Sequence, residues 1–113
     1  MPSDPTFISF YGNNATQNLT TIIINKEDLK APLGINPSYT FTPEESNRAE
    51  SLALAQILRW QRNQDQSQDS QFIISPFEQN LEFRFGKWMR GYRCTIEIWH
   101  DDNENQIPNP NNI

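Results

Sequence analysis

Hydrophobic residues in the first third of the chain come in short runs that predict strands. Residues 7–11 are mostly aromatic, and the turn-forming residues 12–14 follow them directly. Residues 19–24 end in a stretch that is apolar on both faces, which is typical of a strand inside a sheet. Residues 39–41 fit a brief extended segment before the next element. We therefore expect two strands and one short extended segment in this part of the chain.

The middle of the chain carries the periodicity of an amphipathic helix. Thr42 suits an N-cap, Pro43 suits the first helical position, and the glutamate three residues after the cap completes a capping box. Apolar residues then recur at helical spacing, at Ala49, Leu52, Ala53, Ile57 and Trp60, and Leu54 and Leu58 widen the apolar stripe. Arg59 and Arg62 follow near the end, where the helix dipole favours cations. The pattern predicts a helix over residues 43–62.

The C-terminal half alternates between apolar and polar residues with the period of two that a strand requires. Leu81, Phe83 and Phe85 point to one side of the first run, with charged residues between them. In the second run, one side carries Cys94, Ile96, Ile98 and His100, and the other carries Arg93, Thr95, Glu97 and Trp99. Residues 86–91 begin and end with glycine, so we expect them to form the hairpin loop between the runs.

One further short strand is expected at residues 72–74, before Pro76. Together these elements predict an α+β fold, in which a small antiparallel sheet of about five strands packs one long helix on one face, as a two-layer sandwich. We expect one α+β domain over residues 6–100, with a mobile polar connector at 63–71. Residues 1–5 are expected to be flexible, and the polar residues 101–113 to be a disordered tail.

Composition limits the class of protein. The 113 residues are only 35% hydrophobic, yet seven Phe, three Tyr and three Trp supply enough large side chains for a core. A single cysteine cannot form an internal disulfide, and the longest aliphatic run, residues 22–24, is far too short to span a membrane. Residues 1–5 lack the features of a signal peptide. We therefore expect a cytoplasmic protein with no membrane partner.

Most catalytic classes lack the residues that they need. Cys94 and His100 are six residues apart on one expected strand, which separates them by roughly 20 Å and prevents a Cys–His pair. The chain holds one Cys and one His, fewer than the three or four ligands of a zinc site, and its four glycines form no phosphate-binding loop. We expect no catalytic residues, no metal and no cofactor. An enzyme whose site has no recognisable motif stays open as a third possibility.

One segment departs from the acidic composition of the chain. Residues 84–93 hold four of the nine basic residues and no acidic one, so they carry +4 on a chain whose net charge is −5. The remainder of the chain therefore carries −9, which disfavours a polyanionic partner. Aromatic residues lie between the cations, at Phe85, Trp88 and Tyr92.

This basic-aromatic pattern has more than one interpretation. Trp, Tyr and Arg dominate the hot spots of protein interfaces, so the first interpretation is a non-enzymatic module that binds another protein, including a second copy of itself as a homodimer. The second is a nucleic-acid-binding accessory protein, in which rings stack on bases and cations neutralise phosphates. Beside these functional roles stands a structural interpretation, in which the cations pair with nearby carboxylates and Trp88 folds back over the core. The expected partner surface comprises Arg84, Lys87, Trp88, Arg90, Tyr92, Arg93 and Trp99.

Overall fold

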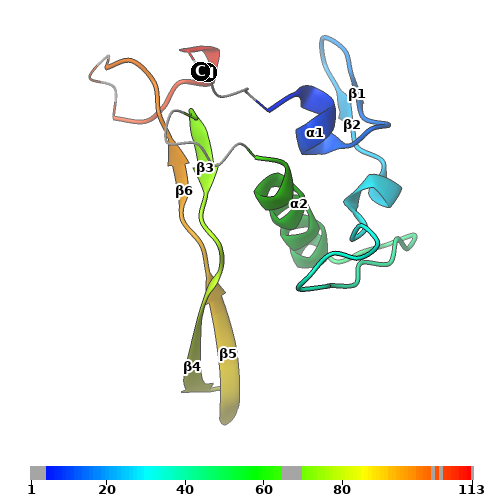
Figure 1. Ribbon diagram of the computed structural model, residues 1–113, viewed down its shortest axis with the longest axis vertical. Helices are drawn as coiled ribbons and strands as arrows, with labels where there is room; N and C mark the ends of the chain where they lie inside the picture. Colours follow the sequence, from blue (N-terminus) through cyan, green and yellow to red (C-terminus); the bar gives the residue numbers. More distant parts are fainter. Residues whose placement is uncertain (1–4, 65–69, 103, 105, 113) are drawn as a thin grey trace. The chain divides into compact units, whose positions relative to one another are not determined.

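The computed structural model describes residues 5–64, 70–102, 104 and 106–112. These residues fall into two compact units, one formed by residues 5–64 and the other by the described residues from 70 onward. The described chain contains one long helix and six short strands in three two-stranded antiparallel sheets (Figure 1). The α+β class is therefore confirmed, while the packing of the helix on one sheet of about five strands stays a prediction. Among the described residues, no helix has the length and apolar character needed to cross a membrane.

The first unit begins with a helix where the sequence predicts a strand. Helix α1 (Phe7–Tyr11) starts at the N-cap Thr6, whose hydroxyl accepts from the N–H of Ser9 at 3.1 Å. The Ser9 hydroxyl in turn accepts from the N–H of Thr6 at 2.9 Å, which completes a capping box. The rings of α1 also pack on Trp60, with a centroid distance of 5.9 Å to Phe10. The strand prediction was wrong because these caps and ring contacts outweigh the β propensity of aromatic residues.

The strand expected at residues 19–24 is much shorter and lies at the surface. Strand β1 (Thr16–Gln17) pairs with β2 (Ile22–Ile23), and the side chains of both strands are exposed. The side chain of Asn18 explains the short length, because its Oδ1 accepts from the N–H groups of Thr20 and Thr21 at 2.9 Å each. This Asx-type turn bends the chain immediately before β2. The prediction of an interior strand was therefore wrong.

Helix α2 (Ala49–Asn63) starts six residues later than its capping signals indicate. The side chain of Asn47 accepts from the N–H of Glu44 at 3.0 Å and donates to the carbonyl of Thr42 at 3.1 Å. Lys26 donates to the carbonyl of Glu44 at 2.8 Å, so this carbonyl already has a partner outside the helix. The helix instead begins after Arg48, whose carbonyl accepts from the N–H of Leu52.

The core of the first unit is small and surrounds one face of α2. Leu29, Phe41 and Ala55 are its buried members, and Ile24 and Leu52 pack against them. Leu29 ends the 3-10 helix η1 (Lys26–Leu29). Residues 39–41, expected as a brief extended segment, form no strand and supply a core side chain instead. The core therefore depends on three segments that are distant in the sequence.

The second unit is a long antiparallel hairpin built from two ladders. Strand β3 (Phe72–Ile74) pairs with β6 (Ile96–Ile98), and β4 (Glu78–Arg84) pairs with β5 (Lys87–Arg93). The sequence predicted β3 with these bounds. A short 3-10 helix, η2 (Pro110–Asn112), lies near the end of the polar tail.

The hairpin loop consists of two residues, not of residues 86–91. Phe85 has φ 54° and Gly86 has φ 76°, and two successive positive φ values belong to a type I′ turn. Gly91 lies within β5 opposite Asn80, and a Cβ atom at this position would lie 2.8 Å from Asn80 Oδ1. Gly91 therefore leaves room for the side chain of Asn80, whereas the sequence analysis interpreted this glycine as the end of the loop.

A β-bulge joins the two ladders. Residues 75–77 face only residues 94–95, so the first strand has one residue more than the second. Pro76 lies in this bulge, where its missing N–H removes no ladder hydrogen bond. The N–H of Ser75 donates to the carbonyl of Thr95 at 2.9 Å, and the N–H of Thr95 donates to the Ser75 hydroxyl at 2.8 Å.

Parts of three segments expected from the sequence lie outside the described residues. This applies to residues 1–4 of the N-terminus, to 65–69 of the expected connector, and to 103, 105 and 113 of the expected tail. The first residue of that connector, Asn63, is the last residue of α2. The single domain expected over residues 6–100 stays a prediction.

Candidate functional site

Alternation along the β4–β5 ladder sorts its side chains onto two faces of different chemistry. One face, called the aromatic face below, carries Gln79, Leu81, Phe83, Trp88, Arg90 and Tyr92. The other, called the charged face, carries Glu78, Asn80, Glu82, Arg84, Lys87, Met89 and Arg93. The register therefore confirms that Leu81 and Phe83 point away from Glu82 and Arg84. It also divides the expected partner surface between two sides of the hairpin.

Edge-to-face ring pairs organise the aromatic face. Phe83 and Trp88 are directly cross-strand and have centroids 5.6 Å apart at 74°. Phe77, in the bulge, packs on Tyr92 in the same manner at 6.2 Å and 76°. These arrangements match the preferred geometry of aromatic pairs. The rings of this face are therefore ordered against one another.

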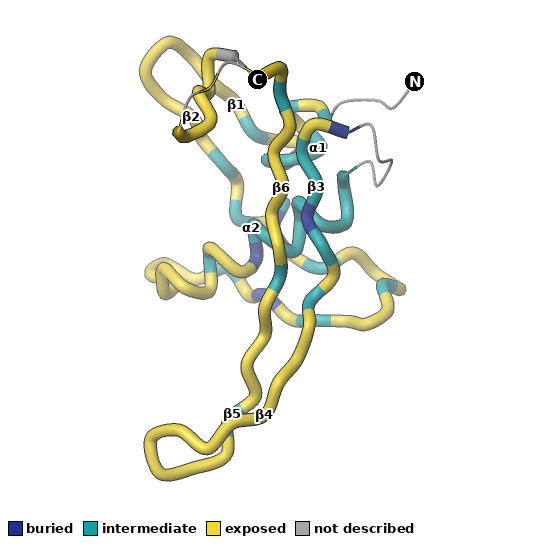
Figure 2. The backbone as a smooth tube through the Cα atoms, turned by 90° about the vertical axis from the view of Figure 1, so that its left-hand side faces the viewer, coloured by how far each residue is buried: buried dark blue, intermediate teal, exposed yellow. Residues whose placement is uncertain are grey.

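The residues of β4 and β5 are nevertheless exposed to solvent along almost their whole length (Figure 2). Trp88 is 69% exposed, Phe83 63%, Tyr92 62% and Leu81 55%. The ring of Trp88 packs on Phe83 within the hairpin, and the structural interpretation, in which Trp88 covers the core and the cations pair with carboxylates, stays a prediction. Arg90 is the cation of this face, and it donates to Gln79 Oε1 at 3.0 Å.

The charged face mixes both signs of charge. Three of the four expected basic residues lie here, and Arg93 is the register partner of Glu78. Arg84 Nε lies 4.0 Å from Glu82 Oε2, a weak ion pair between exposed side chains. Glu78 and Glu82 lie outside residues 84–93 but on the same face of the hairpin. Their negative charges therefore offset part of the +4 charge of residues 84–93.

Trp99 does not belong to the same cluster. It follows β6, where its N–H donates to the carbonyl of Gln71 at 2.8 Å and its ring Nε1 lies 3.4 Å from Glu97 Oε2. Eleven residues separate it from Trp88, which is roughly 36 Å along an extended chain. Trp99 is 60% exposed, but it lies at the opposite end of the hairpin from the Phe83–Trp88 pair. The structure thus separates it from the other six expected residues.

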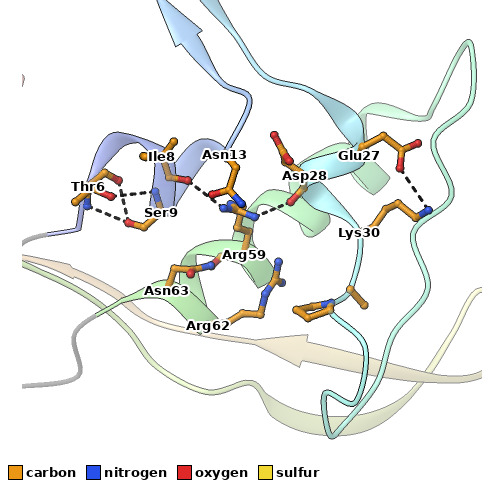
Figure 3. A pocket seen from close by; sticks show the side chains of 12 residues that line it. Thr6, Ile8, Ser9, Asn13, Glu27, Asp28, Lys30, Arg59, Arg62 and Asn63 are labelled. Carbon is orange, nitrogen blue, oxygen red and sulfur yellow. Dashed lines mark hydrogen bonds and ion pairs between the residues drawn. The ribbon is translucent and has the colours of Figure 1, made fainter.

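A second candidate site lies in the first unit and was missed by the sequence analysis. A cavity of about 580 Å³ opens between α1, η1 and the last turn of α2 (Figure 3). Its lining is mostly polar, with Thr6, Ile8, Ser9, Asn13, Glu27, Asp28, Lys30, Ala31, Pro32, Arg59, Arg62 and Asn63. Arg59 and Arg62 are three residues apart and so share one face of α2. The sequence analysis assigned them only to the helix dipole.

Arg59 links α2 to both α1 and η1 at this cavity. Its Nη1 donates to the carbonyl of Asp28 at 2.7 Å, and its Nη2 donates to the carbonyl of Ile8 at 3.0 Å. Burial, and then repulsion by Arg62, lowers the pKa of Arg59 below its usual value. A cation held by backbone carbonyls in this way leaves positive potential at the cavity.

Comparison of the chain with protein-family models, with curated proteins and with solved structures found no match. Function is therefore argued from the two sites themselves.

Proposed function

We propose that the protein is a non-enzymatic module that binds another protein through the aromatic face of the β4–β5 hairpin. Trp88 is the anchor of this surface, supported by Phe83 and Tyr92. The partner offers an apolar patch with an acidic rim, which complements Arg90, the cation of this face. A second copy of the chain, giving a homodimer, is one form of such a partner.

The observation that carries this proposal is the exposure of an ordered aromatic stripe. Trp, Tyr and Arg are the residues that most often act as interface hot spots, and all three occur on the aromatic face. Each aromatic ring buries on the order of 150–250 Å² when it is covered. Four large side chains more than half exposed on one side of a hairpin therefore offer a sizeable apolar surface to a partner.

The low stability expected of an uncovered hairpin also supports a protein-binding role. A two-stranded hairpin without further cover is only marginally stable in water. A partner that covers the aromatic face adds apolar burial and orders the two strands together. Binding and ordering of β4–β5 are then coupled, as in other recognition modes that use an exposed sheet.

The distribution of charge disfavours a nucleic acid as the partner. Base stacking needs rings and several cations on one surface, because affinity for single strands comes from both. In this hairpin the rings lie with Arg90, while Arg84, Lys87 and Arg93 lie on the other face among Glu78 and Glu82. The nucleic-acid role is therefore the second proposal and an outcome of the test.

The test compares two neighbouring positions of β4, because their side chains point to opposite faces of the hairpin and one position therefore serves as the control for the other. A photo-crosslinking residue is placed either at Gln79, on the aromatic face, or at Glu78, one residue away on the charged face. We expect a protein adduct from position 79 and little from 78, and loss of the adduct when Trp88→Ala is added. Lys87→Ala, on the charged face, is the matched variant and should retain the adduct. The amide NMR spectrum of each variant checks that the hairpin still forms.

Adduct mass identifies the partner, with twice the chain mass indicating a homodimer. Equal adducts from both positions, or an adduct that survives Trp88→Ala, would contradict the proposal. Anisotropy of labelled single- and double-stranded oligonucleotides, at low and near-physiological salt, tests the alternative. Micromolar binding with a steep salt dependence, lost in the Lys87/Arg90 double alanine variant, would favour nucleic acid instead.

A further inference from the structure

We propose that the cavity beside α2 in the first unit binds a small phosphate-bearing ligand, with Arg62 as its principal contact and Arg59 as its fixed cationic wall. This site is independent of the hairpin and of the partner proposed for it. It is a polar depression of about 580 Å³ that is open to solvent, so a small ligand can enter it and be held by the polar and charged side chains of its lining.

The two arginines lack carboxylate partners. Ion pairs among the described residues are Lys30–Glu27, Arg48–Glu50 and Arg84–Glu82, and none of them includes Arg59 or Arg62. Arg59 donates to two backbone carbonyls, and Arg62 donates to the hydroxyl of Tyr39 and lies over its ring at 5.7 Å. Neither guanidinium group therefore lies within ion-pair distance of a carboxylate among the described residues, although the negative charge of Asp28 acts on Arg59 and opposes the lowering of its pKa.

One carboxylate at the cavity is paired with a cation of the same lining, and the other accepts from neutral amide groups. Glu27 Oε2 lies 3.4 Å from Lys30 Nζ, and both oxygens of Asp28 accept from Asn14. The charged residues of the lining are three cations and two anions, which leaves a net charge of +1 in a chain whose total is −5. The cavity is thus a local positive site on an acidic protein, and it favours an anion.

Donor geometry favours phosphate over a simple carboxylate. Guanidinium forks pair with phosphate through two parallel N–H donors, and a phosphate has enough oxygens to accept from more than one group. Nη1 of Arg62 is the atom that donates to Tyr39, so the guanidinium has further donors for a ligand. The side-chain amide of Asn13 also lines the cavity and can donate. The described residues of the lining are mostly polar, which suits a ligand with a small polar group beside its phosphate.

An anion would also relieve a cost that the folded unit carries. Nε of Arg59 is buried without an acceptor among the described residues, and the pKa of Arg59 is lowered by burial and by Arg62. A dianion close to both groups opposes that repulsion. The ligated unit should therefore be more stable than the free one.

The experiment titrates the isotope-labelled full chain with pyrophosphate and follows amide NMR shifts. We expect saturable shifts at Asn13, Arg62 and Asn63, with the amides of β4 and β5 unchanged. Arg62→Gln should weaken binding by roughly ten- to hundredfold, the effect of removing a charged hydrogen bond. Arg48→Gln is the matched control, because Arg48 lies on the N-cap of the same helix away from the cavity, and it should bind as the parent does.

Citrate at the same concentrations separates phosphate recognition from general attraction of polyanions, because its charge near neutral pH is close to that of pyrophosphate. Binding of pyrophosphate well above that of citrate, dependent on Arg62 and not on Arg48, supports the proposal. Equal binding of the two anions, equal loss in the two variants, or shifts that map outside the cavity would overturn it. The shift map of the unsubstituted chain decides the question even if Arg62→Gln fails to fold.

Discussion

Both carboxylate oxygens of Asp28 are bound by Asn14. Oδ2 accepts from the backbone N–H of Asn14 at 2.9 Å, and Oδ1 accepts from its side-chain Nδ2 at 3.1 Å. This contact joins η1 to the turn that follows α1. Gly12 lies against the same carboxylate with φ 124°, and a Cβ atom there would lie 2.5 Å from the Cβ of Asp28. The turn can therefore keep its contact only with glycine at position 12.

Gly12→Ala should lower the free energy of unfolding by about 2–3 kcal/mol, because backbone strain and a steric overlap are added together. Gly34 is the matched control, since it also has a positive φ, 77°, but a Cβ atom added there would meet nothing within 4 Å. Gly34→Ala should cost only the strain, about 1 kcal/mol. Urea unfolding measures both values. Equal losses would show that Asp28 yields freely to the added methyl group.

Ala55 gives a second test, of the core around α2. It is 2% exposed and packs with Leu29 and Phe41, so Ala55→Leu should destabilise the protein by about 1–3 kcal/mol through overpacking. Ala53 lies on the same helix and is exposed. Ala53→Leu should change the stability by less than about 0.5 kcal/mol. If the two substitutions have the same effect in thermal unfolding, the described core is wrong.

The hairpin turn at Phe85 and Gly86 gives a third test, of the stability of β4–β5. Phe85 has a positive φ that a bulky residue disfavours, whereas Asn adopts it readily. Phe85→Asn should therefore stabilise β4–β5 by about 0.5–1 kcal/mol, and Gly86→Ala should destabilise it by about 1 kcal/mol. Hydrogen exchange of the β4 and β5 amides measures both changes. Slower exchange after Gly86→Ala would contradict the type I′ turn.

The first turn of α2 gives a further test, of how the stability contributed by Glu50 depends on pH. The pKa of Glu50 is lowered by a backbone hydrogen bond and then by Arg48. A carboxyl group with a lower pKa in the folded state contributes stability above its unfolded pKa, and this contribution is lost as the pH falls through the folded value. Glu50→Gln should therefore reduce stability slightly at about pH 7 and have no such effect at about pH 2. An NMR titration of the Glu50 carboxyl group should place its pKa below the usual 4.5.

Elements specified by neighbouring residues could be predicted from the sequence. Strand β3 has its expected bounds, and the alternation through Leu81 and Phe83 matches the register with β5. The alternation is a local property, because consecutive side chains on a strand point to opposite faces whatever the rest of the chain does. The last residues of α2 are also close to their expected end at residue 62.

Elements that depend on distant residues could not be predicted in this way. The capping signals at Thr42 are complete, yet Lys26 and Asn47 bind the backbone that the helix would have used. Residues 7–11 form a helix partly because Trp60 lies against them. The contacts made by Lys26, Asn47 and Trp60 cannot be inferred from the periodicity of the sequence.

The same distinction holds for the two sites. The basic and aromatic residues of 84–93 were identified from composition, but their division between two faces required the register and the true position of the turn. The cavity of the first unit is formed by three segments, 6–13, 27–32 and 59–63. No motif joins these segments, so Arg59 and Arg62 could be interpreted only as cations at a helix end.

The two-residue turn and the bulge at 75–77 set the pairing of the long hairpin at two separate points. The turn sets the register of β4 with β5, and the bulge absorbs the extra residue before β3 meets β6. The tip can therefore change in length while the β3–β6 end keeps its pairing. Inserting two cross-strand pairs below Phe83 would extend the reach of the Phe83–Trp88 pair by roughly 7 Å on the same side. Inserting a single pair would present it to the opposite side, so the direction of binding depends on whether the number of added pairs is odd or even.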